Sequence, residues 1–370
     1  VVPVIQQTTG EKAPARTYQN LLTSPYDEAL FKFYGAGQLI RVSVQGQAKA
    51  IGNTSLFSSF SISPDSNNIL VATLDEPFSY QVPYYRFAST WSVWGMSGYE
   101  LKQLVQQPLA DNIPQGFDSV RTGPRDFEWR ADKGATLVWA QAQDQGDMKT
   151  DVENHDYIYT LSAPFKRKPT LLAKTERRYA GFTWGNDNIA MLSEWRFSDR
   201  KVRSWIIAPD DANTNPVLFS ERSYNDAYND PGDPIYTHND LGVRVMQVIG
   251  DRYIFLRGNG ASEQGNIPFL DRFDVKTNTT ERLWHSEAPY YERIVALLDE
   301  DGRRFITVRE SKTEQPNLFI RDLDNDSLSQ LTQFPHPYPA FKGIKKEQLR
   351  YQRDDGVELS GTLYLPADYD

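Results

Sequence analysis

The chain has 370 residues, of which 39% are hydrophobic and 13% aromatic; it has no cysteine and carries a formal net charge of −9. It is too apolar for a disordered chain, and the lack of cysteine excludes disulfides, thiolate catalysis and Cys-ligated zinc. The acidic balance, without a run of Lys and Arg, argues against a nucleic-acid partner. No stretch approaches the roughly 20 apolar residues that a membrane span needs.

Residues 1–37 are expected to form a linker and one short helix. Ser24 is a good N-cap, Pro25 suits the first turn, and Asp27 completes a capping-box pattern three residues after Ser24. The pattern predicts a helix from Pro25 to Tyr34.

Residues 38–342 repeat one pattern. An apolar, aromatic-rich strand runs into an acidic turn and a second strand, followed by a variable loop, a third strand, a turn and a fourth strand. The first strand and turn of each repeat occupy residues 60–65, 127–132, 182–187, 245–251 and 294–299. Four-stranded antiparallel repeats are typical of propeller blades, here longer than the roughly 40–45 residues of a WD40 blade.

These repeats predict an all-β fold, an antiparallel β-propeller. Residues 39–52 are consistent with only the third and fourth strands of an additional blade. About five and a half blades would therefore be present, of a ring of about seven or eight.

The tail of the chain predicts a hairpin. Residues 349–353 and 357–365 alternate as strands around Asp355 and Gly356, a pair that favours a two-residue type I′ turn. An isolated hairpin is marginal in water, so these strands should belong to a larger sheet.

A long-period propeller followed by residues 343–351 and an Arg-Asp-Asp-Gly-Val-Glu-Leu hairpin resembles the prolyl oligopeptidase family of serine peptidases. Five stretches resemble its glutamyl endopeptidase-like branch in particular: residues 24–31, 117–125, 268–272, 287–292 and 334–339. The resemblance covers essentially the whole chain.

This resemblance implies a two-domain hydrolase in which the propeller gates and positions peptide substrates. Residues 343–370 would begin an α/β-hydrolase domain, and its Ser-Asp-His triad would lie beyond Asp370. The chain would then contribute no catalytic residue, and alone it is expected to be inactive. The full-length enzyme is expected to cleave peptides after Glu, without a cofactor, in an exported or organellar compartment rather than in the cytoplasm.

The sequence contains no convincing catalytic or metal motif. The segment from Gly95 to Tyr99 comes nearest to the Gly-x-Ser-x-Gly nucleophile elbow, but Tyr99 replaces the last glycine, and we interpret it as a strand-to-strand turn. The four histidines lack zinc-site spacing and are interpreted as structural. The acidic clusters at residues 299–302 and 322–326 are better explained by turn chemistry than by calcium binding.

An acidic substrate side chain, which the resemblance implies, needs a cation near the active site. Arginine suits this role because its planar fork binds a carboxylate at two points. The candidate substrate-binding residues are Arg86, Arg196, Arg257, Arg121 and Arg125.

Two alternative functions remain open. The first is a stand-alone propeller that binds protein partners, against which the hydrolase-like hairpin argues. The second is a carbohydrate-active propeller enzyme with two opposed carboxylates, whose separation sequence alone does not give.

Overall fold

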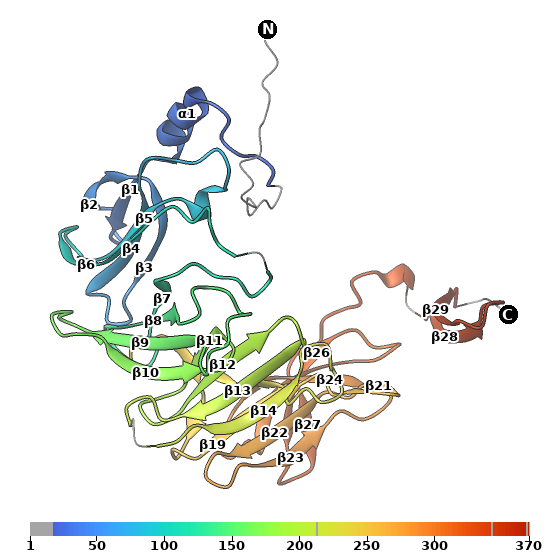
Figure 1. Ribbon diagram of the computed structural model, residues 1–370. Coiled ribbons are helices and arrows are strands. Elements are labelled where there is room, and N and C mark those ends of the chain that lie inside the picture. The colour runs from blue at the N-terminus through green and yellow to red at the C-terminus, as the bar shows by residue number, and fades with distance from the viewer. Residues whose placement is uncertain (1–17, 115, 212–213, 342, 368, 370) are drawn as a thin grey trace. The chain divides into compact units, whose positions relative to one another are not determined.

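The computed structural model describes residues 18–114, 116–211, 214–341, 343–367 and 369 (Figure 1). The linker expected over residues 1–17 lies outside this range. The chain divides into two compact units: the first runs to Pro216 and includes His238–Val245, and the second comprises Val217–Thr237 and the residues from Met246 onward. Strands dominate both units, which confirms the all-β prediction.

The helix α1 (Pro25–Gly35) is confirmed and ends one residue later than predicted. The Ser24 hydroxyl accepts a hydrogen bond from the Asp27 amide at 3.2 Å. In a capping box the Asp27 carboxylate would accept a hydrogen bond from the Ser24 amide. Here it accepts instead from the amide and the hydroxyl of Thr23, one residue earlier, at 2.8 and 2.5 Å. Among the described residues, no helix is long and apolar enough to cross a membrane.

The first unit contains three blade-like sheets and one smaller sheet, all antiparallel with strands adjacent in chain order. The smaller sheet pairs β1 (Gly37–Val42) with β2 (Ala48–Ser55). The first full sheet contains β3 (Phe57–Ile62), β4 (Asn68–Leu74), β5 (Ser89–Gly95) and β6 (Glu100–Gln107). The second contains β7 (Pro124–Trp129), β8 (Thr136–Ala142), β9 (Asp156–Ser162) and β10 (Thr170–Thr175). The third contributes β11 (Arg178–Trp184), β12 (Ala190–Arg196) and β13 (Lys201–Ile207) to this unit.

The second unit begins with β14 (Val217–Ser223), the fourth strand of the sheet that starts at β11, and its described residues contain two further sheets of four or more strands. One is built on β19 (Tyr253–Gly258), β22 (Phe269–Asp274) and β23 (Thr279–His285), with β15 (Asp233–Pro234) and β18 (Val248–Ile249) both paired to β19. The other contains β24 (Tyr291–Leu297), β25 (Arg304–Glu310), β26 (Asn317–Asp322) and β27 (Ser327–Gln330). Short elements complete the chain: η1 (Tyr84–Arg86), β16 (Tyr236–His238), β17 (Arg244–Met246), β20 (Ala261–Ser262), β21 (Gly265–Asn266) and η2 (Pro339–Phe341).

The fourth repeat departs from the prediction of one continuous first strand within residues 245–251. Only Val248 and Ile249 of that stretch pair with β19, and the short strand β15 pairs beside them. The cause is Ile235. Its backbone amide donates to the Phe255 carbonyl at 2.8 Å, and its side chain, with 3% of the residue's surface exposed, packs in the core of this sheet. An earlier segment thus occupies part of the place expected for the first strand.

Aromatic side chains form the core between neighbouring sheets of the first unit. The Phe127 ring lies 5.1 Å from Trp91 of the first full sheet and 5.5 Å from Trp139 of its own sheet. Leu70 and Val93 join this buried cluster. Each sheet therefore buries its apolar face against the next, which is how repeated blades become stable.

All the four-stranded sheets share one arrangement of their ends. Neighbouring strands are antiparallel, so their ends alternate between the two sides of the sheet. The start of the first strand, the end of the second, the start of the third and the end of the fourth all lie on the same side. We call this side of each sheet its loop edge. Long connections lie there, including residues 75–88 and 143–155 in the first unit and 259–268 in the second.

The predicted terminal hairpin is confirmed as β28 (Lys345–Gln352) and β29 (Glu358–Leu365). Its turn differs from the expected type I′ turn, because Gly356 has a left-handed φ of 86° whereas Asp354 and Asp355 do not. The bonds from the Gly356 amide to Arg353 and from the Arg353 amide to the Val357 carbonyl close a three-residue loop. Three-residue loops combine a type I turn with glycine in the left-handed position, which leaves the preceding Asp unstrained.

Candidate functional site

The segment around Ser97 is the turn that the sequence predicts. It connects β5 to β6, and the Gly98 amide bonds to the Gly95 carbonyl at 2.8 Å. Gly98 has a φ of 87°, and a Cβ at this position would lie 1.8 Å from the Gly52 nitrogen. The glycine is needed for this close backbone approach, and the turn is not the strand-to-helix bend that exposes a nucleophile.

The five candidate arginines all lie at the loop edge of their own sheets. Arg86 ends η1 between β4 and β5, and Arg121 precedes β7. Arg125 is the second residue of β7, Arg196 is the last residue of β12, and Arg257 lies one residue before the end of β19. Arg257 belongs to the second unit and the other four belong to the first.

Three of the five arginines contact protein partners through at least one guanidinium nitrogen, although Nη1 of Arg125 is buried without a hydrogen-bond partner among the described residues. Arg125 is buried, and its Nη2 lies 2.7 Å from the Asp156 carboxylate. Arg196 pairs with Asp199 at 2.5 Å. The Nη1 of Arg257 donates to the backbone carbonyls of residues 294 and 295, both at 3.0 Å. Their contacts are those of residues that stabilise loops and sheet ends.

Arg121 and Arg86 are placed differently. Arg121 donates through Nη1 to the amide oxygen of Gln107, whereas its Nη2 is buried and has no hydrogen-bond partner. Arg86 lies 5.5 Å from the ring of Tyr18. Burial and then the nearby positive charge of Arg86 lower the pKa of Arg121, and the weaker attraction of Asp126 opposes them.

A hollow of about 410 Å³ opens beside Arg121. It is lined by residues 107–110, 112–114, 120–122 and Gln145. We call it the Arg121 hollow. None of the described residues that line it is acidic.

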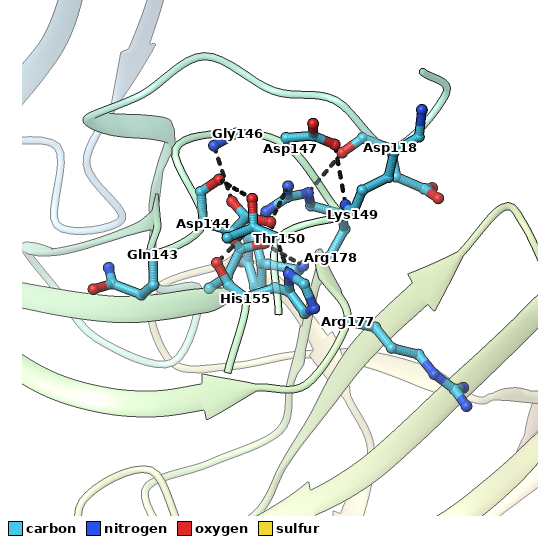
Figure 2. Close-up of polar contacts among 12 residues, drawn as sticks. Asp118, Gln143, Asp144, Gly146, Asp147, Lys149, Thr150, His155, Arg177 and Arg178 are labelled. Atoms are coloured by element: carbon cyan, nitrogen blue, oxygen red, sulfur yellow. Dashed lines mark hydrogen bonds and ion pairs between the residues drawn. The ribbon is translucent and has the colours of Figure 1, made fainter. Parts of the chain in front are cut away.

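A buried ionic network lies at the same edge of the second and third sheets (Figure 2). Arg178 has 2% of its surface exposed; its Nη2 lies 2.5 Å from the Asp144 carboxylate and its Nη1 lies 3.3 Å from that of Asp156. Both carboxylates are fully buried. The Nδ1 atom of His155 lies 2.7 Å from the Asp144 carboxylate, a contact consistent with the structural role expected for this histidine. Burial opposes ionisation of Asp144, but hydrogen bonds from Arg178 and then His155 outweigh it and lower the pKa of this group.

This network holds the segment that carries Arg121. The Nε of Arg178 donates to the backbone carbonyl of Asp118 at 2.6 Å, and the Asp118 carboxylate accepts from the amide of residue 197. The Val120 amide bonds to the Gly146 carbonyl at 3.1 Å. Gly146 has a φ of 82°, and a Cβ there would lie 2.1 Å from the Val120 oxygen. Residues 116–122 are therefore pinned to the loop between β8 and β9.

The network residues Asp118, Asp144, Asp156 and Arg178 were not among the sequence candidates. One signal could have found part of the network: Arg125 and Arg178 both lie at the start of the first strand of their repeats. An arginine repeated at one blade position, in a fold that buries strand ends, indicates a shared structural partner. Here that partner is Asp156, which both arginines contact.

No family model matches this chain. A probable glutamyl endopeptidase, chloroplastic, from Oryza sativa subsp. japonica is 38% identical over 384 residues, covering 100% of this chain and 41% of that protein. The protein of the same name from Arabidopsis thaliana is 39% identical over 382 residues, covering 99% and 40%.

Among solved structures, the chain matches prolyl oligopeptidase B from Galerina marginata at 9% identity and a TM-score of 0.46. This match covers 88% of the present chain and 41% of that one. An acylaminoacyl peptidase from Pyrococcus horikoshii has 14% identity, a TM-score of 0.40, and coverage of 89% and 47%. Similarity at this level does not bear on function. The chain spans about two fifths of the length of the curated relatives it matches. Over this shared part, the chain is similar to two proteins named as probable glutamyl endopeptidases.

Proposed function

We propose that this chain is the part of a serine endopeptidase that admits and positions peptide substrates, and that the whole enzyme cleaves after Glu. The observation that carries the proposal is the identity of 38–39% to glutamyl endopeptidases over essentially the whole chain. Within it, we assign residues 1–37 to a linker and helix, residues 38–342 to the propeller and residues 343–370 to the start of the hydrolase domain.

The course of the chain in the second unit supports this assignment. From the loop edge of the sheet β24–β27, residues 331–344 lead to the hairpin β28–β29. The hairpin exposes 56% of Tyr351 and 60% of Tyr364, whereas a two-stranded sheet needs more strands or a packing partner for independent stability. A hydrolase sheet that continues from β29 would supply both.

The gating role follows from the geometry of a propeller. A closed ring of blades encloses a narrow axial channel. Such a ring above an active site would admit extended peptides and exclude folded proteins. The catalytic serine, aspartate and histidine would lie in the hydrolase domain, so this chain alone would hydrolyse nothing. The two relatives are named as chloroplastic, which supports an organellar compartment for the whole enzyme.

The experiment is a cleavage assay with the full-length protein and matched pairs of peptides that carry Glu or Gln at one position. We expect cleavage after Glu and at least tenfold slower cleavage after Gln. A protein that is cleaved when unfolded should resist cleavage when folded, which tests the gating role. Hydrolysis of a glycoside would favour the carbohydrate-active enzyme, and a failure to hydrolyse any peptide would favour the binding module. Either result would overturn the proposal.

A further inference from the structure

We propose that the Arg121 hollow binds a carboxylate of a peptide, with Arg121 as the direct ligand and Arg86 as a second positive charge. This inference deepens the proposed function and rests on it, because it assigns a chemical class of ligand to one place on the chain.

Arg121 is a charged group held in place without a counter-ion. Its Nη1 is bonded to Gln107, a neutral amide. Gln107 is itself fixed, since its Nε2 donates to the Pro124 carbonyl at 2.5 Å and its Oε1 accepts from Ser89 at 3.1 Å. By contrast, the buried Arg130 and Arg178 are bonded to carboxylates at 2.6 and 2.5 Å. Gln107 therefore orients the Arg121 guanidinium without neutralising its charge, which the attraction of Asp126 offsets in part.

The Nη2 group of Arg121 is the free donor of this arrangement. It is shielded from solvent and has no hydrogen-bond partner among the described residues, a state that Nη1 of Arg125 shares. An unsatisfied buried donor on a charged group is costly, and a ligand that accepts its hydrogen bond recovers that cost. A carboxylate suits this position because its bond to a guanidinium is charge-assisted and roughly twice as strong as a neutral one.

The electrostatic surroundings favour an anion. Burial and Arg86 both lower the pKa of Arg121, yet an arginine remains protonated at neutral pH. The carboxylate of Asp126, the acidic group with a resolved effect on Arg121, is engaged by Arg125 at 3.2 Å. A bound carboxylate would relieve the repulsion between Arg121 and Arg86.

The hollow has a size and lining that fit part of a peptide. Its volume of about 410 Å³ falls within the roughly 300–1,000 Å³ of small-ligand pockets. Leu109, Ile113 and Pro114 supply apolar wall, and Asn112 and Thr122 supply polar groups. The buried network pins the segment that carries Arg121, so little ordering of this backbone segment is needed on binding.

Two sources could supply the carboxylate: an acidic side chain within the peptide or the carboxyl group at its end. The test measures binding of three peptides, blocked at the amino end, to full-length protein whose catalytic serine has been blocked by a fluorophosphonate. One peptide has Glu and an amidated end, the second has Gln and a free carboxyl end, and the third has Gln and an amidated end. Calorimetry gives the dissociation constants, and no cleavage is required.

We expect the third peptide to bind at least tenfold more weakly than one of the other two, and that peptide identifies the source. Arg121→Gln should remove this difference, Arg121→Lys should retain part of it because the charge remains, and Arg86→Gln should reduce it. Arg196→Gln is the matched control: Arg196 also lies at the loop edge of the first unit but has Asp199 as its partner. A far-UV spectrum and a melting curve show whether each variant is folded.

Equal binding of the three peptides, or a difference that survives in a folded Arg121→Gln protein, would overturn the inference. The two proposals can fail separately. Carboxylate binding that needs Arg121 in a protein that cleaves no peptide would refute the peptidase function alone. Cleavage after Glu with unchanged specificity and binding in the Arg121→Gln protein would refute the site alone.

Discussion

Replacing Arg178 with Met should destabilise the first unit strongly. The variant would leave the fully buried Asp144 carboxylate without its arginine, whereas the buried Asp156 carboxylate would keep Arg125 at 2.7 Å. Removing one partner from a buried ion pair costs about 3–5 kcal/mol, because the remaining charge stays buried without compensation. For a domain of this size, 1 kcal/mol lowers Tm by about 2–4 °C, so we expect a decrease of roughly 6–20 °C.

Because the protein has more than one unit, a single melting temperature can average separate transitions. Hydrogen exchange resolves them, through the amides of Tyr179 and Gly146, which donate to the Asp156 and Asp144 carboxylates. Their exchange should accelerate in Arg178→Met, while amides in the sheet β24–β27 stay protected. The matched control is Arg196→Met, which breaks a half-exposed pair of the kind worth about 0–1 kcal/mol. Equal losses in the two variants would refute the stabilising role of the network.

Two further predictions concern the first unit. In the folded state the pKa of Asp144 is lowered, because hydrogen bonds, chiefly from Arg178, outweigh the effect of burial. The ionised Asp144 carboxylate therefore stabilises the fold above the ordinary Asp pKa of about 3.9. This stabilisation is lost as the pH falls below that value. Acid titration followed by near-UV circular dichroism should show this loss, and a folded Asp144→Asn protein should lack that component. Gly98→Ala should destabilise the protein by well over the roughly 1–2 kcal/mol that a left-handed alanine costs, because the added Cβ meets the backbone of Gly52. Gly46 has a similar φ but open space around it, so Gly46→Ala should cost only that amount. Equal urea midpoints for the two variants would contradict this prediction.

Much of the fold could be predicted because its signals are local and repeated. The alternation of apolar strands with acidic turns specifies each strand pair, and Ser24 with Pro25 specifies where α1 begins. The fourth repeat was predicted less well, since the pairing of β15 with β19 joins residues about twenty positions apart. Nothing in the local sequence shows that Ile235, rather than the strand expected over residues 245–251, fills that core.

The candidate site could be predicted only in part. The preference of arginine for carboxylates selected Arg121 and Arg86, and the repeat pattern indicates that they lie in connections between strands. Sequence does not show which arginines already have partners, because the carboxylate that binds Arg125 is Asp156, on a strand that begins about thirty residues later. The difference between a paired arginine and a free donor exists only in three dimensions.

The loop edge explains why this protein places ionic groups where a core is usually apolar. Connections between strands leave many backbone amides and carbonyls without partners, and an apolar side chain cannot satisfy them. Arg178 and Asp118 can, since one donates to a backbone carbonyl and the other accepts from a backbone amide while both are buried. A network of this kind fixes irregular backbone as firmly as a strand, which allows residues 116–122 to present Arg121 in one orientation. If so, weakening the network by Arg178→Met should also weaken carboxylate binding in the Arg121 hollow, although Arg178 does not line it.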